Sequence, residues 1–288
     1  MRYFFLFAAF LILFSCKKTE YEEVIITGNQ APPDSTISTL TKETYANKVY
    51  ISLLGREPTD SERSSGLAIL DKNELSQTNR EEFISEVMAK SGYHWRVFEL
   101  ASLQLLEGND TNEITEMIYI FEFLLTDSSY ADAWPYINYE LVRLYTLQGT
   151  LDDYKAGTIG IIEIHRRLID NYFYDQINMG TENFVVSSFQ HFLDRYPTAA
   201  ELDQGTSMVD GIMAVLFSKT GNSKDDYMDV LFDVDNYFES QVRELYLRYL
   251  FREPTSAEMT EHAASYKSGK DYKALQKAIL SLDEYVGV

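Results

Sequence analysis

The sequence predicts an all-α protein, a multi-helix array of three helix–corner–helix–helix repeats with a helical insertion. Three observations lead to this fold class. Apolar residues recur at helical spacing along most of the chain, only six of its 288 residues are proline, and one ten-residue pattern occurs three times. The pattern reads LLGREPTDSE at 53–62, FLDRYPTAAE at 192–201 and YLFREPTSAE at 249–258. Such self-similarity is typical of a structural unit repeated along the chain.

Apolar stripes upstream of the pattern predict the first helix of each repeat. When the copies are aligned on Arg56, Arg195 and Arg252, apolar residues recur at i, i+3, i+4, i+7 and i+8. The stripes are Ala46, Val49, Tyr50, Leu53 and Leu54; Val185, Ser188, Phe189, Phe192 and Leu193; and Val242, Leu245, Tyr246, Tyr249 and Leu250. Only Ser188 is polar, so each stripe is expected to be the buried face of a helix.

The Pro-Thr-x-x-Glu part of the pattern predicts a corner between two helices. A residue that precedes proline is disfavoured in the α conformation, so the first helices are expected to end at Glu57, Tyr196 and Glu253. Capping boxes are then expected to start the second helices, with the pairs Thr59 and Glu62, Thr198 and Glu201, and Thr255 and Glu258.

The arginines of the pattern are expected to be structural. Arg56, Arg195 and Arg252 fall near helix carboxyl ends, where a cation can meet free carbonyl groups and the negative end of the helix dipole. Each arginine can also pair with the nearby cap glutamate. The alternative interpretation is that the three arginines bind an anionic ligand.

A third helix ending at a tyrosine completes each unit. Apolar residues precede Tyr93, Tyr237 and Tyr285 at matching offsets: Phe83, Val87 and Met88; Tyr227, Leu231 and Phe232; and Leu275, Ile279 and Leu280. The separations from arginine to tyrosine are 37, 42 and 33 residues, a variation expected from loops of different length. The three copies therefore cover 42–97, 184–239 and 240–288.

The first copy also resembles a known family. VYISLLGREPTDSE, followed by FISEVMAKSGY, resembles the short bacterial helical domain of unknown function numbered 4214, which has a tyrosine-rich helix, an LLGR corner and a Ser-x-x-Tyr-like ending. The resemblance covers about half of the mature chain. It implies a helical fold and no catalytic activity.

Residues 1–15 are predicted to be a lipoprotein signal peptide. Arg2 precedes the apolar run YFFLFAAFLILF (3–14), which is too short to span a bilayer as a mature helix. The sequence LFSC (13–16) resembles the lipobox of bacterial lipoproteins, in which cleavage occurs before the cysteine and the thiol carries a diacylglycerol. Cys16 is the only cysteine, so an intramolecular disulfide is excluded. An ordinary signal peptide is the alternative.

The lipobox resemblance implies a location. Lys17 follows the cysteine, where an aspartate is associated with retention in the inner membrane in some bacteria. The expected location is therefore the bacterial outer membrane, with the lipid-anchored protein facing the periplasm or the exterior. Residues 16–41 contain two prolines and several turn-forming residues, and they are predicted to be a flexible tether.

The net charge of the chain limits its partners. Its 45 acidic and 25 basic residues give a formal charge of −20 at pH 7. A surface of this sign repels phosphate backbones, so nucleic acid is not an expected partner. Anionic lipid headgroups are also repelled, which leaves the acyl anchor as the expected attachment to the membrane.

Residues 98–183 are predicted to be an aromatic-rich helical insertion between the first and second copies. Helices are expected at 114–127, 134–149 and 158–173. This segment is the first place to look for a binding surface specific to this protein. The alternative is that the insertion completes the core.

No catalytic, cofactor or metal site is expected from the sequence. The four histidines, His94, His165, His191 and His262, lack metal-ligand spacing, and the acidic segments 108–113 and 229–236 lack the EF-hand pattern. The best nucleophile candidates are Ser187 and Ser188, with His191 and Asp194 nearby, but all four lie on one predicted helix. No pair of carboxylates is singled out for glycoside cleavage.

The expected function is therefore that of a non-catalytic, membrane-anchored lipoprotein. We expect it to act as a protein-interaction or accessory subunit of a bacterial envelope assembly, because helical repeats build extended binding surfaces. The alternatives are a glycan-binding protein of the cell envelope that uses exposed tyrosines, and a glycan hydrolase with carboxylates in 98–183.

Overall fold

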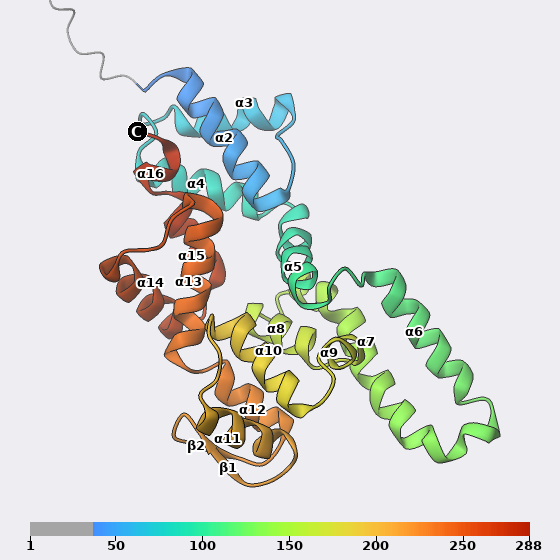
Figure 1. The fold of residues 1–288 in the computed structure, drawn as a ribbon. Helices are drawn as coiled ribbons and strands as arrows, with labels where there is room; N and C mark the ends of the chain where they lie inside the picture. Colours follow the sequence, from blue (N-terminus) through green and yellow to red (C-terminus); the bar gives the residue numbers. More distant parts are fainter. Residues whose placement is uncertain (1–36) are drawn as a thin grey trace, which may run out of the picture. The chain divides into compact units, whose positions relative to one another are not determined.

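The computed structural model describes residues 37–288, which contain fifteen α-helices, one 3-10 helix and one short β-hairpin (Figure 1). The prediction of an all-α fold is therefore confirmed. The predicted signal peptide, Cys16 and most of the predicted tether lie outside the described residues. No helix within residues 37–288 has both the length and the apolar content needed to cross a bilayer.

The three copies of the repeat contain equivalent helices. The first copy has α2 (Thr39–Leu54), α3 (Asp60–Leu70), α4 (Gln77–Met88) and the start of α5 (Gly92–Leu105). The second has α10 (Thr181–Leu193), α11 (Ala199–Val209), α12 (Lys224–Leu231) and the start of α13 (Asp235–Leu250). The third has α13, α14 (Ser256–Gly269), α15 (Tyr272–Leu280) and α16 (Asp283–Val286). The predicted boundary between residues 239 and 240 thus lies inside α13, which the second and third copies share.

The predicted stripes form the buried faces of α2, α10 and α13. All of their residues are buried except Leu54 and Leu250, which are partly buried against the same core. The tyrosines that end the repeats, Tyr93, Tyr237 and Tyr285, are also buried, with at most 2% of their surface exposed. Ser188 keeps its place in the buried stripe because its hydroxyl lies 2.6 Å from the hydroxyl of Tyr227.

The first helices end earlier than the sequence predicts. The last residue of each helix was predicted to be the one before the proline. In the structure α2, α10 and α13 each end at a leucine, three positions before that predicted residue. The residue after each leucine is left-handed: Gly55 at φ 70°, Asp194 at φ 52° and Phe251 at φ 57°. Because a left-handed residue cannot continue a right-handed helix, the helix stops there and the proline follows in extended chain.

The first and last repeats pack against each other, with α4 on α15 and α2 on α16. The hydroxyl of Tyr45 donates to the carbonyl of Leu280 at 3.1 Å, and that of Tyr93 lies 2.6 Å from the side-chain oxygen of Gln276. Arg80 donates to the carbonyl of Ser281 at 2.7 Å. The third repeat also contacts the second, through α10 and α13, so it links the other two.

The insertion contains α6 (Thr111–Leu124), the 3-10 helix η1 (Ser128–Ala133), α7 (Trp134–Ala156), α8 (Ile161–Ile169) and α9 (Tyr172–Ile177). The prediction of one helix over 158–173 is wrong, because the chain breaks at Asp170 and Asn171. The side chain of Asn171 accepts the backbone N–H of Tyr174 at 3.1 Å and caps α9, which starts a new helix at this point.

The one β-hairpin in residues 37–288 lies in the second copy, which has the longest separation from arginine to tyrosine. Strands β1 (Ala214–Leu216) and β2 (Lys219–Gly221) pair antiparallel, with Ala214 opposite Gly221. The two residues of the turn, Phe217 and Ser218, both have positive φ. Turns of this kind usually contain Asn-Gly or Asp-Gly, so the Phe-Ser pair gave no signal in the sequence.

Candidate functional site

The three corners share one set of contacts. In each, the arginine donates two hydrogen bonds of 2.7–2.9 Å to the cap glutamate. The pairs are Arg56 with Glu62, Arg195 with Glu201, and Arg252 with Glu258. Each glutamate also accepts the backbone N–H of the cap threonine, which in turn accepts the N–H of the glutamate, so all three capping boxes form.

Each corner arginine also lies over an aromatic ring six residues before it in the chain. The guanidinium carbon is 5.6 Å from the ring centre of Tyr50, 5.1 Å from that of Phe189 and 5.2 Å from that of Tyr246. Each arginine also donates a hydrogen bond of 2.9–3.1 Å to the carbonyl oxygen of the residue that follows it. The guanidinium groups are thus already occupied, which favours the structural interpretation over anion binding.

The corner glutamates predict an acid-dependent part of the stability. Hydrogen bonds from Arg195 lower the pKa of Glu201 from its ordinary 4.5 to about 2. A carboxyl with a lowered pKa in the folded state contributes stability above about pH 4.5, and this contribution disappears as the pH falls through about 2. Glu201→Gln is therefore expected to cost about 1 kcal/mol near neutral pH and little near pH 2, measured by urea denaturation.

Glu57→Gln is the matched control for this experiment, because the Glu57 side chain is exposed and forms no ion pair within the described residues. It is expected to leave the pH dependence unchanged. A loss of stability for Glu201→Gln that stays constant from pH 7 to pH 2 would contradict the assigned role of the ion pair.

The structure separates the predicted nucleophile candidates. Ser188 is buried against Tyr227, His191 has its Nδ1 3.0 Å from the hydroxyl of Tyr174, and Asp194 pairs with Arg243 at 2.9 Å. Ser187 lies on α10 with no hydrogen bond from its side chain in the described part of the chain. These groups therefore form no hydrogen-bonded triad.

The other histidines also have separate surroundings. His165 is buried with its Nδ1 2.9 Å from the hydroxyl of Tyr237, and burial lowers its pKa to about 3. His262 lies beside the ring of Tyr246, and His94 lies beside Lys273. Residues 37–288 contain no group of three or more His, Cys, Asp or Glu side chains that could hold a metal ion.

The insertion carries an exposed apolar surface. Helices α6 and α7 lie side by side as an antiparallel pair joined by η1 (Figure 1). Ile114, Ile118 and Phe121 form the buried stripe of α6. Large apolar side chains outside the buried stripes of both helices remain exposed, and we call them the aromatic face: Tyr119, Ile120, Phe123, Tyr136, Tyr139, Val142 and Tyr145.

The aromatic face continues from one helix to the other. The hydroxyl of Tyr145 on α7 donates to the carboxylate of Glu122 on α6. Tyr119 lies three residues before Glu122 and therefore on the same side of α6. Tyr119, Phe123 and Val142 expose 61–69% of their surface, a large fraction for side chains of this size. A gathering of exposed large apolar side chains is typical of an interaction site.

The exposed charges around this face are all negative. Between residues 111 and 145 the exposed charged residues are Glu113, Glu116, Glu122, Asp127 and Asp132. The one basic residue in this range, Arg143, is buried. The stretch that carries the aromatic face thus exposes carboxylates and no cation.

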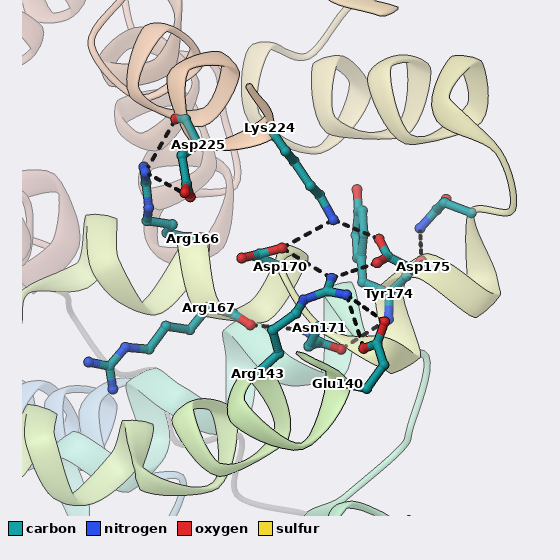
Figure 2. Close-up of polar contacts among 11 residues, drawn as sticks. Glu140, Arg143, Arg166, Arg167, Asp170, Asn171, Tyr174, Asp175, Lys224 and Asp225 are labelled. Carbon is teal, nitrogen blue, oxygen red and sulfur yellow. Dashed lines mark hydrogen bonds and ion pairs between the residues drawn. The ribbon is translucent and has the colours of Figure 1, made fainter. Parts of the chain in front are cut away.

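A cluster of charges around Arg143 holds α7 against its neighbouring helices (Figure 2). Arg143 donates to both oxygens of Glu140 at 2.9 and 3.0 Å and to Asp175 at 2.5 Å, and it lies 3.0 Å from Asp170. Lys224 pairs with Asp170 at 3.1 Å and with Asp175 at 2.9 Å. The cluster therefore joins α7 to α9 and α12 and to the end of α8.

The charges within this cluster depend on each other. Burial raises the pKa of Glu140, while Arg143 acts in the opposite direction. Burial would lower the pKa of Arg143, but Asp170 and Asp175 outweigh it and raise that pKa. A carboxyl with a raised pKa would suit a general acid, but both oxygens of Glu140 are occupied by Arg143. The geometry therefore favours a structural role for the cluster.

The Arg143 cluster also supports the aromatic face. The guanidinium carbon of Arg143 lies 5.0 Å from the ring centre of Tyr139. The cluster was not predicted from the sequence, although a Glu-x-x-Arg pair within an otherwise apolar helix was a signal for it.

No family model matches the chain, and comparisons with curated proteins and with solved structures found no match.

Proposed function

We propose that the protein is a non-catalytic lipoprotein, anchored through Cys16 to the bacterial outer membrane, that binds a protein partner of an envelope assembly through the aromatic face. The observation that carries this proposal is the exposure of seven large apolar side chains on two neighbouring helices. Buried tyrosine side chains are often among the few residues that carry most of the affinity at a protein interface.

The charges around the face indicate the chemistry of the partner. Five exposed carboxylates favour a partner whose own apolar contact area is surrounded by lysines and arginines. The same carboxylates repel anionic lipid headgroups, and a neutral glycan would gain little from them. A basic protein surface therefore fits the aromatic face better than a membrane or a glycan does.

The packing of α7 suits the aromatic face to binding. Glu140 and Arg143 are nearly fully buried, with side chains 5% and 7% exposed, and their contacts fix α7 against α8 and α9. Side chains on a helix that is held in this way lose little freedom when a partner binds, which lowers the entropic cost of association. The aromatic face is thus presented in a defined orientation.

The proposal is tested by purifying the full-length protein from detergent-solubilised membranes at low salt, without cross-linking. We expect one envelope protein with a basic surface to be recovered in fixed proportion, and to be released as the salt concentration rises. Recovery of this chain alone would contradict the proposal, and salt-independent binding to purified polysaccharide would favour the glycan-binding alternative.

The anchor is tested separately. Cys16→Ser is expected to move the protein from the membrane fraction to the soluble fraction, because the thiol that carries the lipid is lost. If the variant stays with the membranes after the partner has been removed by salt, the lipid anchor is wrong.

A further inference from the structure

A cavity of about 550 Å³ lies between the start of α5, the loop from α7 to α8 and the loop from α14 to α15. Its walls include Lys155, Lys270, Lys273 and His94, and one carboxylate, that of Asp271. The Asp271 carboxylate accepts the backbone N–H of Ala274 at 2.9 Å and caps α15. In a chain with a formal charge of −20, three lysines around one cavity are an unusual concentration of positive charge.

Lys273 is the central cation of this cavity. Its ammonium nitrogen lies 3.2 Å from Nε2 of His94 and 5.0 Å from the ring centre of Tyr93. It forms no ion pair with a carboxylate among residues 37–288. A lysine held between an imidazole and an aromatic ring, both neutral, has an uncompensated charge that an anion could neutralise.

The other two lysines have only weak partners. Lys155 lies 3.3 Å from Asp152 and Lys270 lies 3.7 Å from Asp233, and both lysine side chains are about half exposed. Ion pairs of this kind contribute little stability, so either lysine can turn to a ligand at small cost.

The start of α8 adds hydrogen-bond donors to the same wall. Gly160 and Ile161 line the cavity, and Gly160 is the cap residue of α8 and has no side chain to satisfy the first N–H groups of the helix. Backbone N–H groups at such a position can donate to an oxyanion. They supplement the lysines and would not make a site without them.

We propose that this cavity binds a small dianionic oxyanion of the phosphate monoester class. Three ammonium groups, each from a different element, can each donate a hydrogen bond to one oxygen of a phosphate. The cavity volume lies in the range of small-molecule sites, and the rings of Tyr154 and Tyr272 in its wall offer contact to the organic part of the ligand. This site is separate from the aromatic face.

The pKa of His94 is expected to change when an anion occupies the cavity. The groups around it are Lys273 and Asp271 at the start of α15, Lys155 and Tyr154 of α7, and Lys270 at the end of α14. Burial lowers the pKa of His94, and Lys273 and Lys155 lower it further. An anion bound between these lysines is expected to raise the pKa of His94, because it screens their charge.

The experiment is a pH titration of the His94 ring proton by NMR on the full chain, with inorganic phosphate as the probe and chloride at equal ionic strength as the reference. We expect phosphate to raise the pKa of His94 in a saturable manner. Lys273→Met, which keeps the contact with Tyr93, is expected to weaken phosphate binding about tenfold.

Lys277→Met is the matched control, because Lys277 lies one turn further along α15, outside the cavity lining, and contacts Ser85 at 3.3 Å. It is expected to bind phosphate as the wild type does. The proposal is overturned if phosphate leaves the pKa of His94 unchanged, or if both methionine variants, folded by circular dichroism, bind phosphate equally. Neither outcome depends on a protein partner, so this test is independent of the proposed function.

Discussion

Replacing Arg143 with leucine is expected to lower the free energy of unfolding by about 3–5 kcal/mol, because it leaves the buried carboxylate of Glu140 without its partner. Glu140 loses both of its hydrogen bonds, and its side chain is only 5% exposed. Lys224 still pairs with Asp170 and Asp175 but does not contact Glu140. The measurement is urea denaturation near pH 7, followed by circular dichroism.

The pH dependence of this variant gives a second readout. Burial raises the pKa of Glu140 in the folded protein, and the loss of Arg143 removes the larger of the two cationic influences that oppose this effect, leaving that of Lys224. A carboxyl with a raised pKa destabilises the fold when it is ionised, so the deficit is expected to shrink as the pH falls through that pKa. Replacing Glu140 together with Arg143 by leucine should recover part of the lost stability for the same reason.

Arg166→Leu is the matched control on the neighbouring helix. Arg166 pairs with Asp225 and Asp229, whose side chains are 75% and 71% exposed, so its loss is expected to cost at most about 1 kcal/mol. Figure 2 shows Arg166 and Asp225 apart from the cluster around Arg143. Equal losses for the two arginine variants would show that the Arg143 cluster is not a coupled buried unit.

The corners illustrate what the sequence could predict. A capping box joins residues three apart, so the pairs such as Thr255 and Glu258 depend on local sequence alone. The left-handed ends of the preceding helices were less visible, because only the first copy has a glycine there, and Asp194 and Phe251 occupy the same position in the others. Without a glycine, the proline three residues later was the only stop signal, and it placed the helix ends too late.

The candidate site depended on information that local sequence does not contain. Arg143 and Asp175 are 32 residues apart, and Lys224 and Asp175 are 49 apart, so these pairs exist only once the fold is formed. Residues 117–124 of α6 are apolar except for Glu122, which is typical of a helix covered on most sides. In the structure α7 is its principal partner, and this leaves Tyr119 and Phe123 exposed.

Replacing Tyr119, Phe123 and Val142 together with alanine is expected to weaken partner binding about 100-fold or more, since truncating a central aromatic anchor commonly costs about 2 kcal/mol or more. The free energy of unfolding should change by no more than about 1 kcal/mol, because these side chains are already largely exposed in the folded protein. Tyr139 is left in place because its ring contacts Arg143. The measurements are the dissociation constant for the recovered partner and urea denaturation.

Leu40→Ala combined with Tyr196→Ala is the control, because these side chains are 72% and 69% exposed but lie on the repeats, away from α6 and α7. If the face variant loses binding and the control does not, the affinity comes from the insertion. If Glu122→Gln weakens binding less at high salt than at low salt, the carboxylates near the face attract the basic partner. If the face variant and the control bind the partner equally, the contact is elsewhere, and the exposed tyrosines have no part in it.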